Sequence, residues 1–376
     1  RIDFIPYTAA GYKAIGTLFN SLFGVNYHVA MIVGAIVVIG YTVLGGFLAV
    51  STTDLIQSIV MTFALVFIVF FGISQAGGWE SVTANATSMP GYLNLTQGYD
   101  AATNQAGSFP ALSIVSTLAW GLGYFGMPHI LLRFMAIEEE KKLNDSRRIA
   151  TIWVVISMFI AVFIGVIGYS VSVAGKIPFL TTSADAETVI IQLSDLMSQH
   201  GALLAIMAGI ILSGILAATM STADSQLLTA ASSVSQDLMQ GFMGMKLSAK
   251  AAMRVARLTV VAIAAVGMFL AWDPNSSVFR VVSFAWAGFG AAFGPVILVS
   301  LWWRRMTRNG ALAGMTLGAI TVLVWHQFAW FGLYEIVPGF IVSLAAIFIV
   351  SLLGKAPEKA VTDSFELMER RLKAES

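Results

Sequence analysis

A stripe of hydroxyl side chains runs through an apolar segment of this sequence and has the chemistry to bind a small cation. Ser221 and Thr222 are adjacent, and the backbone carbonyl of Ala218 lies one helical turn before them. A hard monovalent cation such as Na⁺ prefers several neutral oxygens with at most one carboxylate. These three residues therefore provide half of a sodium site, and a facing helix must provide the rest.

The stripe extends beyond these two hydroxyls at spacings of three and four residues, so that its members share one helical face. Hydroxyl groups in membrane helices often bond to the preceding turn or pack closely against another helix. We prefer that interpretation for the outer members and cation binding for Ser221 and Thr222. The outer members are Ser225, Thr229, Ser232 and Ser233.

Two carboxylates lie within or at the mouth of apolar segments. Asp224 precedes Ser225 on the segment that carries the hydroxyl stripe, and Asp54 stands at the start of another apolar run. An ionisable side chain within a bilayer is costly, and it marks a functional site by default. Asp54 and Asp224 are therefore candidate functional residues. For Asp54 an alternative has equal weight. It follows the hydroxyl residues 51–53 and could instead be the N-cap of the helix that begins there.

Glycine and proline interrupt the apolar run over 110–135, in the sequence WGLGYFGMPH that begins at Trp120. Backbone groups freed from a helix persist in a bilayer only where they line a cavity or hold a ligand. Trp120 and Tyr124 are one turn apart and flank Gly121, so aromatic faces stand beside exposed donors and acceptors. Such a gap suits a small zwitterion, with its carboxylate on the freed N–H groups and its ammonium against the rings. An alternative is that Trp120 and Tyr124 anchor the helix at the membrane interface, but their position in mid-span weakens it.

The composition excludes a water-soluble domain, because 57% of the 376 residues are hydrophobic and 11% are charged. A net charge of +1 provides no basic surface for nucleic acid, and a chain without cysteine has no disulfide or thiol chemistry. The histidines lack the spacing of metal ligands, so no metal site other than one for sodium is expected. Apolar runs of about 20 residues, enough to cross a bilayer core of about 30 Å, recur along the chain. The predicted membrane helices are 2–20, 28–49, 54–76, 110–135, 149–174, 203–239, 251–272, 276–303, 310–331 and 336–354.

Lysine and arginine fall mainly in alternate connections, which predicts the orientation. By the positive-inside rule these connections are cytoplasmic. The protein is thus expected to be a multi-pass protein of the cell inner (plasma) membrane, with a transmembrane domain over 1–354 and a cytoplasmic tail over 355–376. A short amphipathic helix over 186–199 is expected on the outer face, and the helix over 203–239 is too long to end within the bilayer. The other predicted cytoplasmic connections are 136–148, 240–250 and 304–309.

Several longer stretches resemble the sodium:solute symporter family, and together they cover essentially the whole chain. Several are weak motifs individually, but in this order they are highly specific. They are GGFLAVSTTDLIQS (45–58), LAWGLGYFGMPHILLRFMA (118–136), MSTADSQLL (220–228), SFAWAGFGAAFGPVILVSLWWRRMTRNGALAGM (283–315), LYEIVPGF (333–340) and SLLGKAP (351–357).

The resemblance implies an all-α fold of two inverted five-helix repeats, the LeuT-type transporter fold, with about ten helices in this sequence. It also implies that Arg1 lies inside the third helix of the first repeat, with the first helices missing. The activity implied is sodium-coupled import of proline, or a closely related small amino acid, by alternating access. Na⁺ is then the coupling ion, without an organic cofactor and without enzymatic activity.

The resemblance also assigns roles to residues of this sequence. Ala218, Ser221 and Thr222 correspond to the main sodium site, and Asp54 corresponds to a carboxylate used with sodium. Asp224 and Ser225 lie where some relatives build a second sodium site, although Asp224 replaces a small neutral residue. Met127 stands where relatives often have glutamine, which leaves strict proline selectivity open. The substrate pocket is expected to contain Trp120, Gly121, Tyr124, Met127 and Pro128.

Two alternatives belong to other functional classes. Asp54 and Asp224 in one membrane protein are compatible with an intramembrane aspartyl protease, in which two carboxyls share a proton. The chain is also compatible with a symporter-like input domain of a membrane sensor. A separate expectation concerns Gly290 and Gly294, whose four-residue spacing is typical of a close helix–helix contact.

Overall fold

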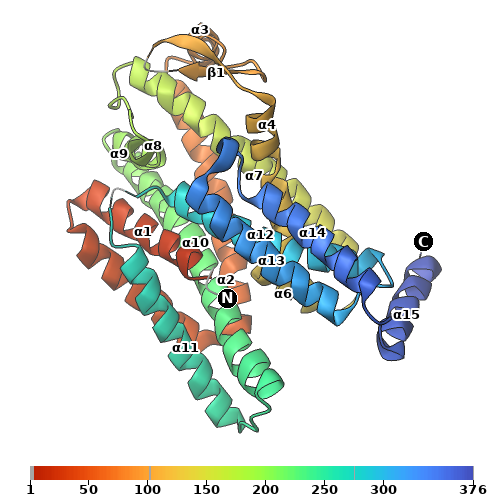
Figure 1. The fold of residues 1–376 in the computed structure, drawn as a ribbon. Helices are drawn as coiled ribbons and strands as arrows, with labels where there is room; N and C mark the ends of the chain where they lie inside the picture. Colours follow the sequence, from red (N-terminus) through yellow and green to blue (C-terminus); the bar gives the residue numbers. More distant parts are fainter. Residues whose placement is uncertain (1–3, 101–102, 275, 376) are drawn as a thin grey trace. The chain divides into compact units, whose positions relative to one another are not determined.

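The computed structural model describes residues 4–100, 103–274 and 276–375, and it is almost entirely helical (Figure 1). Within the described residues, eight helical segments are long and apolar enough to cross a membrane. The chain forms two compact units. The first contains the residues up to Ser108 together with Ala136–Val282, and the second contains Phe109–Met135 together with the residues from Ser283 onward.

The first unit is built around two hydrophobic clusters. One cluster joins α1, α2, α10 and α11 around Tyr12, Met31 and Leu227. The other joins α2, α7, α9 and α10 around Ile68 and Ile167. The elements of this unit are α1 (Phe4–Phe23), α2 (Tyr27–Gln75), α3 (Trp79–Ser88), β1 (Gln97–Asp100), β2 (Gln105–Ser108), α7 (Lys142–Val173), α8 (Ser183–Ala186), α9 (Val189–Ser198), α10 (Ala202–Ser232), the π-helical segment η2 (Ser233–Phe242) and α11 (Ala249–Leu270).

α2 is one helix of 49 residues, so the predicted break between the helices 28–49 and 54–76 is wrong. Its first part lies beside α1 and its second part leads to α3 (Figure 1). The hydroxyls that suggested a turn bond back onto the helix instead. Thr52 Oγ1 donates to the carbonyl of Leu48 and Thr53 Oγ1 to that of Val50, each at 2.9 Å. Such bonds leave the helical ladder intact.

The start of α2 shows where its true cap is. The side chain of Asn26 accepts hydrogen bonds from the backbone N–H groups of His28 at 3.0 Å and Val29 at 3.3 Å. Asp54 lies in the interior of the same helix, where the first-turn N–H groups that a cap satisfies are absent. The capping interpretation of Asp54 is therefore wrong.

Two other predicted helices in this unit are present with different ends. The long helix predicted over 203–239 is observed as α10 followed by η2, a helical run of 41 residues whose last part is π-helical. The amphipathic segment predicted over 186–199 is observed as α9, preceded by the single turn α8. α3 and the antiparallel hairpin β1–β2 were not predicted from the sequence.

The carboxylate of Glu187, directly after α8, holds the start of α12 (Val278–Trp302). It accepts a hydrogen bond from Ser277 Oγ at 2.7 Å and from the backbone N–H groups of Val278 and Phe279, each at 3.3 Å. A carboxylate at this position satisfies orphan donors and complements the positive end of the helix. A side chain far away in the sequence thus caps α12.

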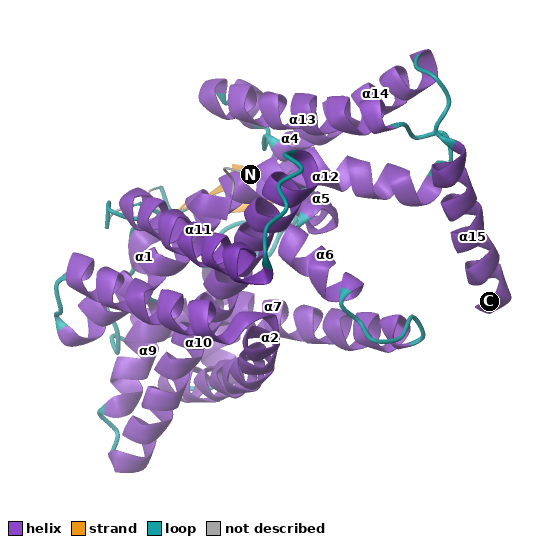
Figure 2. Ribbon diagram, turned by 90° about the horizontal axis from the view of Figure 1, so that it is seen from below, coloured by secondary structure: helices purple, strands orange, loops and turns teal. Residues whose placement is uncertain are grey.

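The second unit consists of a broken helix, three long helices and the helix α15 near the C-terminus. α13 and α14 lie side by side in both ribbon views (Figure 2). Glycines make this contact close, because a Cβ on Gly318 would lie 3.0 Å from the Cβ of Ser343 on α14. The helix α15 occupies the predicted tail and was not predicted. The elements are α4 (Ala111–Leu118), α5 (Trp120–Gly123), the 3₁₀ turn η1 (Tyr124–Gly126), α6 (Pro128–Met135), most of α12, α13 (Arg308–Phe328), the 3₁₀ turn η3 (Trp330–Gly332), α14 (Ile336–Leu353) and α15 (Lys359–Glu375).

Candidate functional site

Three oxygen atoms of α10 converge at the centre of the hydroxyl stripe. Ser221 Oγ and Thr222 Oγ1 each donate a hydrogen bond to the Ala218 carbonyl, at 3.1 Å in both cases. All three residues are partly buried. Each hydroxyl oxygen keeps lone pairs after donating its proton, so the cluster offers neutral oxygens of the kind that Na⁺ prefers.

An outer member of the stripe makes the same kind of bond without a neighbouring hydroxyl on the same carbonyl. Thr229 Oγ1 donates to the Ser225 carbonyl at 2.8 Å, and the Thr229 side chain is buried. This geometry agrees with the interpretation that outer hydroxyls bond to the preceding turn. The convergence of two hydroxyls on one carbonyl distinguishes Ser221 and Thr222 from Thr229.

A buried carboxyl group lies one turn further along α10. Asp224 has no exposed surface, and its Oδ2 accepts a hydrogen bond of 2.8 Å from the hydroxyl of Tyr41 on α2. The same hydroxyl lies 3.2 Å from the Met220 carbonyl, and Ser225 Oγ lies 3.4 Å from Asp224 Oδ1. Asp54 is close enough to Asp224 for the two carboxyl groups to interact electrostatically. Asp224 and Ser225 therefore form one polar group with Tyr41, which was missed, and Asp54 lies within electrostatic range of it.

The predicted interruption at Trp120–His129 is present. α4 ends at Leu118, the short α5 leads into the 3₁₀ turn η1, and Met127 is extended with φ −77° and ψ 107°. α6 then begins at Pro128, where a missing N–H group is tolerated. The side chain of Met127 is fully buried.

Four aromatic rings gather at this interruption. The rings of Trp120 and Trp286 are stacked with centroids 5.2 Å apart, and Tyr124 meets Trp286 edge-on at 4.8 Å. The rings of Tyr334 and Trp120 are also stacked, with centroids 6.3 Å apart. Trp286 Nε1 donates to the Trp120 carbonyl at 2.9 Å, and the Tyr334 hydroxyl donates to the Ser283 carbonyl at 2.6 Å. The aromatic cluster of Trp120, Tyr124, Trp286 and Tyr334 therefore has two members that sequence reasoning missed.

Glycines let α12 approach the interruption closely. A Cβ on Gly126 would lie 2.8 Å from the backbone nitrogen of Gly294 and 3.0 Å from the Cα of Gly290. The prediction of a close helix contact at Gly290 and Gly294 is confirmed. Gly121, in contrast, has open space where its Cβ would be. A ligand group can approach the backbone more closely at Gly121 than at Gly126.

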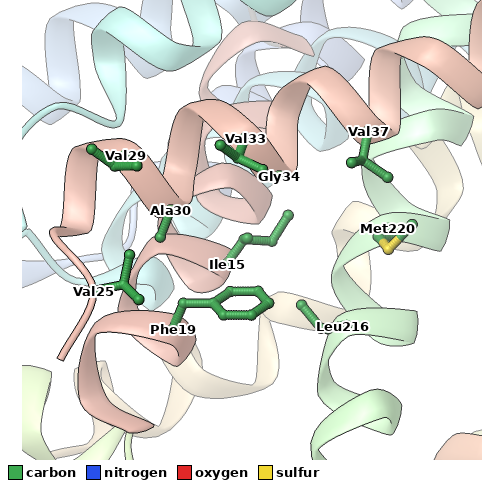
Figure 3. Close-up of a pocket in the computed structure, with 10 residues that line it drawn as sticks. All are labelled: Ile15, Phe19, Val25, Val29, Ala30, Val33, Gly34, Val37, Leu216 and Met220. Atoms are coloured by element: carbon green, nitrogen blue, oxygen red, sulfur yellow. The ribbon is translucent and has the colours of Figure 1, made fainter. Parts of the chain in front are cut away.

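A separate cavity of about 260 Å³ lies between α1, α2 and α10 (Figure 3). All ten residues that line it are apolar, including Phe19 on α1, Val33 on α2 and Met220 on α10. Neither a cation nor a zwitterion finds a polar partner among such side chains. The cavity is therefore unsuited to the chemistry that the polar residues of α10 support.

Comparisons with known proteins agree with these features. The profile of the Sodium:solute symporter family matches residues 2–318. The high-affinity proline transporter PutP of Bacillus subtilis (strain 168) is 42% identical over 366 residues, which cover 97% of this chain and 73% of the relative. The sodium/proline symporter of Escherichia coli (strain K12) is 42% identical over 368 residues, covering 96% and 69%. The osmoregulated proline transporter OpuE of Bacillus subtilis is 41% identical, covering 99% and 73%.

A solved structure also shares the fold. It is the substrate-bound outward-open state of a Na⁺-coupled sialic acid symporter, with a TM-score of 0.71 at 18% sequence identity. The match covers 95% of this chain and 74% of that chain. The all-α, LeuT-type fold expected from the sequence is confirmed. The expectation of helices before Arg1 gains no support from these alignments and stays a prediction. By its profile match and its relatives, this chain belongs to the sodium:solute symporter family.

Proposed function

We propose that this protein imports proline, or a closely related small amino acid, together with Na⁺ by alternating access. One structural observation carries the proposal, which is the helix interrupted at Tyr124–Met127 beside the aromatic cluster. The names of the relatives support proline as the substrate and sodium as the coupling ion. All of these relatives are transporters, so the protease and sensor alternatives gain no support.

For the ion, we propose the oxygens of Ala218, Ser221 and Thr222 as the main ligands. This proposal is supported by the two hydroxyls that donate hydrogen bonds to the same carbonyl within a membrane helix. We propose Asp54, Asp224 and Ser225 as a second group that interacts with sodium. A carboxyl group that lies within a membrane span is expected to serve such a role.

For the substrate, we propose contacts with the aromatic cluster and with the backbone around Gly121. The stacked rings offer faces for an ammonium group and exclude water. The open space at Gly121 exposes backbone to a carboxylate, and Pro128 begins the following half-helix, whose N-terminal end favours negative charge. Met127 is proposed to shape this site from its buried position.

Coupling requires that Na⁺ bind one conformational state more tightly than the other, since a ligand shifts an equilibrium only by its differential affinity. Moving one charge through 100 mV yields about 2.3 kcal/mol, which is a concentration ratio of roughly fifty for the cargo. The experiment that tests the function is uptake of labelled proline by proteoliposomes with an inward Na⁺ gradient. Uptake is expected with the gradient, and equal uptake with choline in place of Na⁺ would refute the proposal.

The transmembrane domain over 1–354 and a cytoplasmic tail over 355–376 also remain our proposal. Their support is the concentration of Lys and Arg in alternate connections. The chain contains no cysteine, so single cysteines report orientation directly. We expect Thr87→Cys to react with a membrane-impermeant maleimide on intact cells and Lys373→Cys to react only after permeabilisation. Labelling of Lys373→Cys from outside would reverse the proposed orientation.

Replacing Tyr124 by alanine tests the aromatic cluster. Tyr124→Ala is expected to raise the proline concentration for half-maximal uptake about tenfold, because a lost ring contact of about 1 kcal/mol or more weakens binding by that order. The dependence on Na⁺ should stay nearly unchanged. Phe125→Ala is the matched control, since Phe125 is the adjacent aromatic residue with a similar exposure of 43% against 41%. Equal effects of both substitutions would remove Tyr124 from the substrate site.

A further inference from the structure

A buried amide oxygen on α2 has no place in the sites described so far. Gln57 Oε1 is buried and has no hydrogen-bond partner among the described residues. A buried acceptor left unsatisfied costs about 1–3 kcal/mol, and unsatisfied groups of this kind call for an explanation such as a bound ion. Gln57 lies one turn after Asp54 on the same helix.

The hydroxyl side chains that follow Gln57 on this stretch are satisfied. Ser58 Oγ donates to the Leu55 carbonyl at 2.7 Å. Thr62 Oγ1 donates to the Ser58 carbonyl at 2.8 Å and accepts from Trp153 Nε1 at 3.0 Å. The hydroxyl side chains that follow Gln57 on α2 therefore do not share its unsatisfied state.

One close contact and one electrostatic interaction indicate how the second part of α2 runs against α10. Gly214 on α10 contacts Ala64 so closely that a Cβ on Gly214 would lie 2.9 Å from the Cβ of Ala64. Ten residues earlier on α2 and ten residues later on α10, Asp54 interacts electrostatically with Asp224. The residue numbers fall along one helix as they rise along the other. The two helices are therefore antiparallel, with Ala64 opposite Gly214.

This register places Gln57 opposite the hydroxyl cluster. Gln57 lies seven residues before Ala64, and Ser221 lies seven residues after Gly214. Seven residues make nearly two helical turns. Gln57 therefore points in the same direction from α2 as Ala64, and Ser221 in the same direction from α10 as Gly214, to within about 20°. Gln57 and Ser221 also lie at the same distance along their helices from the Ala64–Gly214 contact. Gln57 and Ser221 therefore lie at one level on facing sides of the two helices.

We infer that Gln57 is a further residue of the sodium site, with its amide oxygen as the ligand from the facing helix. The hydroxyls of Ser221 and Thr222 with the Ala218 carbonyl provide oxygens from α10 only. A neutral amide oxygen from α2 adds to this set without adding charge, as a monovalent cation prefers. This inference rests on the proposed function, and it assigns a residue to the ion site on which that function depends.

The test compares three variants of the purified full chain in detergent. The measurement is the rise in melting temperature on replacing choline chloride by NaCl, because a ligand that binds only the folded state stabilises it. Gln57→Leu keeps a similar size but lacks the oxygen and is expected to lose most of the Na⁺-induced rise. Gln57→Glu keeps an oxygen in the same place and is expected to retain it. Gln75→Leu, the same substitution at the end of α2, is the matched control and should behave as the unmodified protein.

Transport measurements separate this inference from the proposed function. In proteoliposomes, Gln57→Leu is expected to raise the Na⁺ concentration for half-maximal proline uptake at least tenfold, with the half-saturating proline concentration at high Na⁺ within twofold. If the unmodified protein shows no Na⁺-dependent uptake, the proposed function fails. If it transports and Gln57→Leu keeps the same Na⁺ dependence and the same Na⁺-induced stabilisation, only the role of Gln57 is overturned.

Two further outcomes also bear on Gln57. A lowered melting temperature of Gln57→Leu in choline with an unchanged Na⁺ response overturns the inference, because Gln57 is then a packing residue. Should Gln57→Leu fail to fold, the Na⁺ response of Gln57→Glu decides. A retained response supports the amide oxygen as a ligand, and a lost response overturns that role.

Discussion

Removing both hydroxyls of the central cluster is expected to abolish sodium-driven uptake at low Na⁺. In the double variant Ser221→Ala with Thr222→Ala, the ion loses two of the three α10 oxygens that converge at Ala218. An interaction with a charged group contributes about 1.5–3 kcal/mol, and each 1.4 kcal/mol is a factor of ten in affinity. The Na⁺ concentration for half-maximal proline uptake should therefore rise at least a hundredfold. The measurement is initial uptake in proteoliposomes over a series of Na⁺ concentrations at constant ionic strength.

Thr219→Ala is the matched control for this double variant. Thr219 lies on the same helix and its hydroxyl bonds to the carbonyls of Ile215 at 3.2 Å and Leu216 at 2.8 Å. Thr219→Ala therefore removes a partly buried hydroxyl like those of Ser221 and Thr222, but one that does not bond to the Ala218 carbonyl. We expect its Na⁺ dependence to change by less than about threefold. Uptake by the double variant at low Na⁺ that matches the control would show that the ion binds elsewhere.

Gly126→Ala is expected to disrupt the second unit, since the added methyl group would collide with backbone atoms. Its Cβ would lie 2.8 Å from the Gly294 nitrogen and would also meet the carbonyl of Phe289. Side-chain rotation cannot relieve a contact with backbone, so η1 and α12 must separate. Overpacking of this kind typically costs about 1–3 kcal/mol, and occasionally more. The expected result is a melting temperature lowered by several degrees in detergent, together with lost proline uptake.

Gly121→Ala is the structural control for that substitution. It places the same methyl group in the same interrupted region, where the structure leaves open space. Its melting temperature should stay close to that of the unmodified protein, since substitutions without new contacts usually change stability by less than about 0.5 kcal/mol. Equal stability of Gly126→Ala and Gly121→Ala would contradict the close approach of η1 and α12.

Features that depend on local spacing could be predicted from the sequence. The convergence of Ser221 and Thr222 on Ala218 needs only the three- and four-residue spacing of one helix. The interruption before Pro128 follows from the backbone properties of glycine and proline. Both features were predicted because the relevant residues are near one another in the chain.

Features that depend on distant pairing could not be predicted in the same way. Trp286 joins Trp120 across 166 positions of sequence, and Tyr41 reaches Asp224 across 183. A tryptophan or tyrosine in an apolar run has many uses, and only the packed structure selects one of them. The wrong break before Asp54 has a local cause, because Thr52 and Thr53 suit a turn or a helix equally well and tertiary packing favours the helix.

The continuity of α2 has a mechanical consequence. Asp54 and Ala64 lie ten residues apart on the second part of α2, where Asp54 interacts electrostatically with Asp224 and Ala64 contacts Gly214, both on α10. A hydrogen-bonded helix resists stretching. A shift of α2 along its axis at the close Ala64–Gly214 contact therefore also shifts Asp54 relative to Asp224. Under the proposed function, release of an ion from the two carboxylates and a change at the glycine contact would then occur together.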